Sequence, residues 1–195
     1  GIPVLIDVDP NTMGLCPDSV KKWIDEFTML RSGSLFVRGS GRRLFGMLAV
    51  HLYGIPCRIN ELNKISNEFG ITLVEDNAEG IGALSSNQPT GSFGEASILS
   101  FNGNKTLTAG GGGMVVSRNK DLIDTAANWA NHCRETAQSD PSDFGFNLKL
   151  TNLQAAVGLA QFEQLESFIE QRRYSHDLYS EGFRNIGLDL VSGLH

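Results

Sequence analysis

The stretch that decides the fold is residues 74–116, which read VEDNAEGIGALSSNQPTGSFGEASILSFNGNKTLTAGGGGMVV. A short apolar strand ends there at an acidic pair whose second member is Asp76. A second strand is expected over residues 98–101, and it opens into a polar, glycine-rich loop that carries Lys105. A third strand begins at Met114. The stretch therefore predicts two chemically distinct groups, a carboxylate and an amine, beyond the ends of neighbouring strands.

An aspartate at one strand end and a lysine beyond another suit pyridoxal phosphate. That cofactor is held as a lysine Schiff base, and its ring nitrogen pairs with a carboxylate. Lys105 is the candidate Schiff-base residue, and Asp76 would keep the ring nitrogen protonated. Two plainer interpretations stay open, since Asp76 could cap the next helix and Lys105 could be a solvated loop lysine.

Three further positions could contribute to such a site. Ser100 lies five residues before Lys105, where a hydroxyl could bind a phosphate or simply bond the backbone. The glycine run 110–113 fits no nucleotide-binding motif, so we expect these glycines to let the backbone pass close to the cofactor or to a neighbouring subunit. His51, in HLYG, could line the pocket or be a hydrogen-bonded histidine at a strand end.

Composition narrows the class of protein. The 195 residues, 41% of them hydrophobic, suffice for one sizeable domain or for a domain with an appendage. The net charge of −6 is spread along the chain and forms no basic stripe, so nucleic acid is not an expected partner. No apolar run reaches the roughly 18 residues that a membrane helix needs, so no membrane association is expected.

The cysteines and histidines exclude two other classes. Three widely spaced cysteines without a CxxC pair favour a reducing cytoplasm over a disulfide framework. The four histidines form no HxxxH or HxH pair, so a metal site is not expected.

Apolar runs and turn signals predict an alternation of strands and helices. The expected elements up to the deciding stretch are a strand over 2–8, a helix from Pro17, an exposed loop over 31–43 with a possible short strand at 35–37, a strand over 45–50, a helix over 59–69 and a strand over 71–74. After it we expect a helix over 119–132, a polar loop over 135–143, one long amphipathic helix from about Thr151 to Tyr179 and a last strand over 187–191.

This order predicts an α/β fold with a mostly parallel sheet. Strand–helix–strand units place consecutive strands parallel, and near-continuous apolar strands are typical of sheets covered on both faces. In such open sheets, ligands bind at the carboxyl ends of the strands. His51, Asp76 and Ser100 each stand at such an end, and Lys105 lies just beyond one.

Together, EDNAEGIGA, GSFGEASILSFNGNKTLTAGGGGMVV and GFNLKLTNLQAAVGLAQFEQLE resemble the DegT/StrS family of sugar aminotransferases, with HLYG and PVLIDVD matching in the same order. The resemblance covers nearly the whole chain. It implies a pyridoxal phosphate enzyme of fold type I, whose large domain is a three-layer αβα sandwich. The lysine retained at 105 favours transamination, because family members that act as dehydratases carry a histidine there.

The resemblance also assigns site residues. Asp76 would pair with the pyridine nitrogen, and Glu79 would lie near the ring hydroxyl and the substrate. Ser100 would bind the phosphate, and Lys105 would form the Schiff base. Asn147 would reach the phosphate of the partner subunit's cofactor, which implies a homodimer with shared active sites.

Departures from the family concern sequence and length. This chain has FNLKL at 146–150 where members often have Tyr-Asn-Tyr-Arg-Met, Asn77 in place of a usual alanine and Ala109 in place of a usual threonine. Family chains are much longer, so we expect residues 1–182 to be a partial large domain without its N-terminal segment. Residues 183–195 would then begin a C-terminal small domain.

The sequence leads to one main hypothesis and two alternatives. The main one is a cytoplasmic aminotransferase that moves an amino group from a donor, expected to be glutamate, to a nucleotide-linked keto sugar. The alternatives are a pyridoxal phosphate-dependent sugar dehydratase or other lyase, and an inactive fragment that serves as a binding or dimerisation module.

Overall fold

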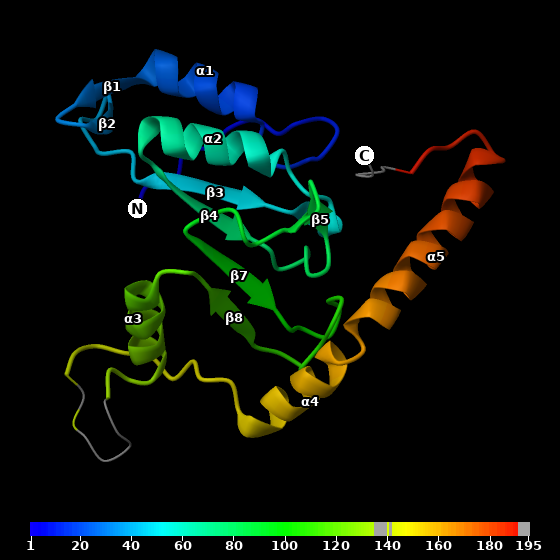
Figure 1. The fold of residues 1–195 in the computed structure, drawn as a ribbon. Coiled ribbons are helices and arrows are strands. Elements are labelled where there is room, and N and C mark those ends of the chain that lie inside the picture. Colours follow the sequence, from blue (N-terminus) through cyan, green and yellow to red (C-terminus); the bar gives the residue numbers. More distant parts are fainter. Residues whose placement is uncertain (135–139, 141, 191–195) are drawn as a thin grey trace.

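The structure is a computed structural model that describes residues 1–134, 140 and 142–190 (Figure 1). Its helices are α1 (Pro17–Phe27), α2 (Ile59–Phe69), α3 (Lys120–Ala130), α4 (Asn152–Phe162) and α5 (Leu165–Arg184), with a short 3-10 turn at Leu52–Gly54. Its strands are β1 (Thr28–Arg31), β2 (Ser34–Val37), β3 (Gly46–Val50), β4 (Thr72–Asp76), β5 (Leu84–Ser85), β6 (Gln88–Pro89), β7 (Ala96–Ser100) and β8 (Gly113–Val116).

The central sheet has the strand order β3-β4-β7-β8. β3, β4 and β7 are parallel, and β8 runs antiparallel to β7. The pairings Val50 with Asp76 and Asp76 with Ile98 bring the carboxyl ends of the three parallel strands to one edge. The prediction of a mostly parallel α/β sheet is confirmed, and the antiparallel strand sits at its border.

Helix α2 covers one face of the sheet, with α1 lying outside it (Figure 1). Ile59, Leu62 and Ile65 recur at helical spacing and are 0–1% exposed, so they share the buried face. Gly70 ends the helix in the left-handed conformation that glycine adopts without strain. Burial of apolar surface by each of the three side chains of α2 contributes about 1.5–3 kcal/mol to the stability of this packing.

The opposite face of the sheet carries apolar side chains that the described residues leave uncovered. Leu48 is 58% exposed, Ile98 40% and Val115 43%. Their strands read as continuous apolar runs, as expected for a sheet that is covered on both faces.

The N-terminal segment corrects one prediction. Residues 2–8 form no strand; Val8 only makes an isolated bridge with Leu15. Leu5 is 92% exposed, and no described strand pairs with the segment in a hydrogen-bonded ladder. Apolar composition alone was therefore insufficient to form a strand. The expected loop over 31–43 is likewise partly a hairpin, because β1 pairs with β2 across Ser32 and Gly33, both at positive φ.

The C-terminal half corrects another prediction, because the single long helix is two helices. α4 starts at a capping box in which Thr151 and Gln154 exchange hydrogen bonds. The backbone leaves helical geometry at Gln164, and α5 then sets off in a new direction (Figure 1). The change of direction lets Leu165 pack on a small apolar cluster of Phe101, Leu107 and Ala109.

Two further expectations concern the ends of segments. Residues 187–190 form no strand, and residue 191 of that expected strand lies outside the described residues. Most of the expected loop over 135–143 also lies outside them.

Candidate active site

The candidate site lies at the carboxyl edge of the parallel strands. Asp76 is the last residue of β4 and Ser100 the last of β7, while His51 directly follows β3. The loop of residues 101–112 leaves this edge and returns to it at Gly113, which pairs with Ser100. Lys105 lies in that loop and is therefore held at the same edge as Asp76 and Ser100.

The structure brings Lys105 and Glu79 into direct contact. The Lys105 Nζ donates to Glu79 Oε1 at 3.1 Å, and the two side chains are 15% and 32% exposed. The backbone N–H of Tyr53 donates to the other carboxylate oxygen at 2.7 Å. This N–H and the ammonium of Lys105 hold the pKa of Glu79 below its usual range. Glu79 is thus an ionised acceptor that orients the Lys105 side chain.

Tyr53 contributes to this contact through its backbone. Its φ of 56° is unusual for a residue with a side chain, and it belongs to the short turn that follows His51. A Cβ at Gly54, which has a φ of 78°, would lie 3.1 Å from the Glu79 carbonyl oxygen. The HLYG turn therefore aims an N–H at Glu79, and no side-chain pattern in the sequence could have revealed that role.

Asp76 is half-buried and its position is set from two sides. Its Oδ1 accepts from the Ala78 N–H at 3.1 Å, and its carbonyl oxygen accepts from the His51 N–H at 3.1 Å. The plainer interpretation of Asp76 as the cap of a following helix is wrong, because the next element after β4 is the short strand β5. The carboxylate instead makes a local turn contact with Ala78. This contact occupies one carboxylate oxygen and is compatible with a second role for the other.

The glycine run explains how the Lys105 loop can close. A Cβ at Gly113 would lie 2.5 Å from the Leu99 carbonyl oxygen, and a Cβ at Gly112 would lie 2.4 Å from Leu150 Cδ1. The backbone contact at Gly113 leaves no room for a side chain where β8 pairs with β7, and Gly112 has a φ of 81° that favours glycine. These approaches are to other parts of the same chain, and the expected approach to a cofactor or a neighbouring subunit stays a prediction.

Asn147 is exposed in the connection between α3 and α4, where it forms a backbone bridge with Asn131. Within the described residues, no hydrogen bond joins it to Lys105, Glu79 or Asp76. Its assigned role toward a partner subunit stays a prediction.

His51 is a satisfied buried histidine. Its Nε2 lies 3.0 Å from Glu75 Oε2, its Nδ1 accepts from the Cys57 N–H at 3.3 Å, and both side chains of the His51–Glu75 pair are 0% exposed. The interpretation of His51 as a pocket residue is therefore not supported, because its ring points into the protein interior.

Glu75 is the residue that sequence reasoning missed. It also accepts from the backbone N–H groups of Gly91, Phe93 and Gly94, each at 2.7 Å. Burial raises the pKa of Glu75, but the hydrogen bonds from His51 and these N–H groups outweigh it, and the net pKa is lowered. Alternation was the available signal: Glu75 is two residues from buried Leu73, on the α2 side of the sheet.

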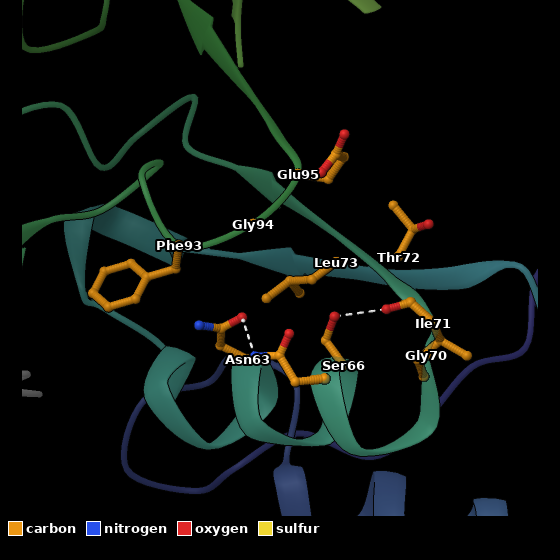
Figure 2. Close-up of a pocket in the computed structure, with 10 residues that line it drawn as sticks. Asn63, Ser66, Gly70, Ile71, Thr72, Leu73, Phe93, Gly94 and Glu95 are labelled. Atoms are coloured by element: carbon orange, nitrogen blue, oxygen red, sulfur yellow. Dashed lines mark hydrogen bonds between the residues drawn. The ribbon is translucent and has the colours of Figure 1, made fainter. Parts of the chain in front are cut away.

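A cavity of about 440 Å³ lies at the other end of the strands. It is lined by residues at the end of α2, the start of β4 and the approach to β7 (Figure 2). Figure 2 shows Ser66 donating to the Ile71 carbonyl oxygen at 2.6 Å within it. None of the predicted site residues lines this cavity, so it is separate from the candidate active site.

The sequence matches the DegT/DnrJ/EryC1/StrS aminotransferase family over residues 1–195. The chain belongs to this family. It is 34% identical over 173 residues to the putative pyridoxal phosphate-dependent aminotransferase EpsN of Bacillus subtilis, covering 88% of this chain and 42% of that protein. It is 32% identical over 179 residues to a GDP-perosamine synthase of Vibrio cholerae, covering 91% of this chain and 44% of that protein.

Solved structures agree with the family assignment. The structure of DesI with its TDP-sugar product superimposes with a TM-score of 0.74 at 30% identity, over 93% of this chain and 42% of that one. The fold is therefore that of the family's α/β aminotransferases. The chain spans less than half the length of these relatives.

Among the described residues, no helix combines the length and apolar character needed to cross a bilayer.

Proposed function

We propose that the protein containing this chain is a pyridoxal phosphate-dependent aminotransferase that aminates a nucleotide-linked keto sugar. The observation that carries the proposal is the contact between Lys105 Nζ and Glu79 Oε1 at 3.1 Å, at the sheet edge where β4 and β7 end. Family membership and the sugar-linked names of the relatives support it.

The residues at this edge fit the cofactor by their chemistry. Lys105 offers an amine for the aldehyde, Asp76 a carboxylate for the ring nitrogen and Ser100 a hydroxyl for the phosphate. Asp76 uses one oxygen for the Ala78 N–H, and a carboxylate retains further acceptor capacity. When bound, pyridoxal phosphate supplies an electron sink for negative charge at the substrate carbon.

Lys105 holds and moves the reacting proton. Its Nζ must lose a proton before it can act as a nucleophile or a base, and Glu79 lies within hydrogen-bond reach of that Nζ. Because the pKa of Glu79 is lowered, Glu79 stays ionised and orients the amine. Asp76 would pair with the ring nitrogen of the cofactor and help to hold a proton there.

The substrates and the assembly follow from the relatives. The GDP- and TDP-sugar names of relatives support a nucleotide-linked keto sugar as amino acceptor, and glutamate is the proposed donor. We propose a homodimer in which Asn147, exposed here, reaches the phosphate site of the partner subunit. Residues 1–182 would be part of the large domain, and residues 183–195 would begin the small domain.

We also propose a cytoplasmic location. Cys16, Cys57 and Cys133 are unpaired, as is usual in a reducing compartment. Burial raises the pKa of the Cys57 thiol to about 12, so this cysteine is an inert part of the core.

The decisive experiment traps the cofactor on the full-length protein. Borohydride reduction with pyridoxal phosphate, followed by peptide mass mapping, should place the adduct on Lys105. Lys105→Ala should abolish both the adduct and amine transfer, while Lys64→Ala, at an exposed lysine of α2 outside the proposed site, should keep both. An adduct on another residue, or full activity of Lys105→Ala, would refute the proposal.

Product analysis separates the alternatives. A transaminase yields an amino sugar and a keto acid in equal amounts, whereas a dehydratase yields a sugar that has lost oxygen. An inactive binding module would show neither product and no adduct.

A further inference from the structure

The start of helix α5 lies beside the loop that joins β7 to β8, and the rest of the helix runs away from the sheet (Figure 1). Leu165, Ile169 and Arg172 follow one another at spacings of four and three residues, so they lie on the same side of the helix. We call these three residues the clamp face. Each of them contacts one of the two loops that hold Glu79 and Lys105, or both.

Leu165 joins the two loops in one apolar cluster. It packs on Phe101, Leu107 and Ala109, which flank Lys105, and Ile81 of the Glu79 loop packs on the same cluster. The start of α5 therefore holds the two loops together by burial of shared apolar surface.

Ile169 lies directly against the Glu79 loop. A Cβ at Gly82 would lie 2.3 Å from Ile169 Cδ1, and Gly82 has a φ of 88°. The backbone conformation favours glycine at 82, and a larger residue there would also have to displace the Ile169 side chain. The closeness shows that α5 sits on this loop without an intervening side chain.

Arg172 reaches the Lys105 loop from a distance of 67 residues in sequence. Its Nη2 donates to the Lys105 carbonyl oxygen at 3.1 Å. Lys105 also donates a hydrogen bond from its Nζ to Glu79. Lys105 is therefore held at its backbone by Arg172 of α5 and at its amine by the Glu79 carboxylate. The local contact of its own N–H with the Asn102 carbonyl oxygen, at 3.1 Å, completes the turn.

We propose that the clamp face sets the position of Lys105 relative to Glu79, and that Arg172 is a positioning residue for Lys105. This inference rests on the proposed function, because positioning of Lys105 matters for catalysis only if Lys105 reacts. The hydrogen bond fixes the backbone from which the amine extends. Its loss would let the loop sample positions in which Nζ no longer lies against Glu79.

The test compares Arg172→Gln with Arg173→Gln in the full-length protein. Both variants remove one exposed arginine charge from adjacent positions of α5, and within the described residues Arg173 makes no hydrogen bond. In the protein without cofactor, hydrogen exchange of the amides over 102–109 should be about fivefold faster in Arg172→Gln, the ratio expected for loss of one modest hydrogen bond. Arg173→Gln should exchange like the wild type.

The second readout follows Lys105 itself. With pyridoxal phosphate added, borohydride trapping at Lys105 should be about fivefold slower in Arg172→Gln, and the pH midpoint of the lysine–cofactor absorbance band should shift. Arg172→Lys keeps a charge and a donor and should fall between the wild type and Arg172→Gln.

Equal exchange rates, or equal trapping rates and pH midpoints, in Arg172→Gln and Arg173→Gln would overturn the inference. A wild-type protein that forms no adduct at Lys105 would instead overturn the proposed function, and the exchange comparison would still report on the clamp.

Discussion

Replacing Glu75 by glutamine should destabilise the protein severely, although it changes one oxygen to an amide nitrogen. Glu75 Oε2 accepts from His51 Nε2 at 3.0 Å and from the Gly91 N–H at 2.7 Å. Glu75 Oε1 accepts from the Phe93 and Gly94 N–H groups, each at 2.7 Å. Whichever way the glutamine amide turns, its NH₂ faces two donors and leaves both without an acceptor.

The expected loss of unfolding free energy follows from the two hydrogen bonds that Glu75→Gln breaks. A hydrogen bond to a charged group contributes about 1.5–3 kcal/mol, so losing two of them should cost about 3–6 kcal/mol of unfolding free energy. The histidine cannot relieve the conflict by switching tautomer, because its Nδ1 already accepts from the Cys57 N–H. Backbone movement could recover part of the cost, so the lower end of this range is the expected value.

The assay is urea unfolding of the full-length protein without cofactor, with Glu68→Gln as matched control. Glu68 pairs with Lys21 at 3.5 Å on the surface, where an ion pair contributes less than about 1 kcal/mol. If Glu75→Gln costs no more than Glu68→Gln, the buried acceptor network does not have the role argued for it.

The same residue predicts a pH dependence. The pKa of Glu75 is lowered in the folded state, so its contribution is fully present above the unfolded pKa of about 4.5 and is lost as pH falls through the lower, folded value. Wild-type stability should therefore decline below about pH 4.5, and part of that decline should be absent in Glu75→Gln. Parallel pH profiles of the two proteins would contradict the assignment.

Three further predictions concern the sheet edge, the core and the site. Gly113→Ala should destabilise by about 1–3 kcal/mol in urea unfolding, because its Cβ would lie 2.5 Å from the Leu99 carbonyl oxygen; Gly182→Ala, in open space on α5, should instead stabilise by about 0.5–1 kcal/mol. Leu62→Ala, at a fully buried position of α2, should cost about 2–5 kcal/mol by the same assay, and a cost below 1 kcal/mol would show that the α2 interface is not a packed core. Carbon-13 NMR titration should find the Glu79 pKa below 4.5 in the protein without cofactor and closer to 4.5 in Lys105→Ala; an unchanged value would mean that the two groups do not interact in solution.

Local pattern was sufficient for most of the sheet and its covering helix. The apolar spacing of Leu62 and Ile65, stopped by Gly70, identifies α2 because helical periodicity and a glycine C-cap are properties of the chain itself. Asp76, Ser100 and Lys105 could be assigned to one edge because parallel strands end together. Pattern failed over residues 2–8, because a strand depends on a neighbouring strand that composition does not reveal.

Contacts between distant segments were decided only by the tertiary structure. The sequence itself indicates Lys105, and only the resemblance to the family adds Glu79 to the same site. The 3.1 Å contact between them depends on the HLYG turn and on α5. In the sequence, Glu75 and Asp76 are adjacent acidic residues with nothing to distinguish them. In the fold, the Glu75 side chain points into the interior, where it bonds His51 and the loop before β7, whereas Asp76 ends β4 at the site edge. The physical reason is that hydrogen bonds to backbone N–H and C=O groups carry no side-chain signature, so they become visible only when the fold brings those groups together.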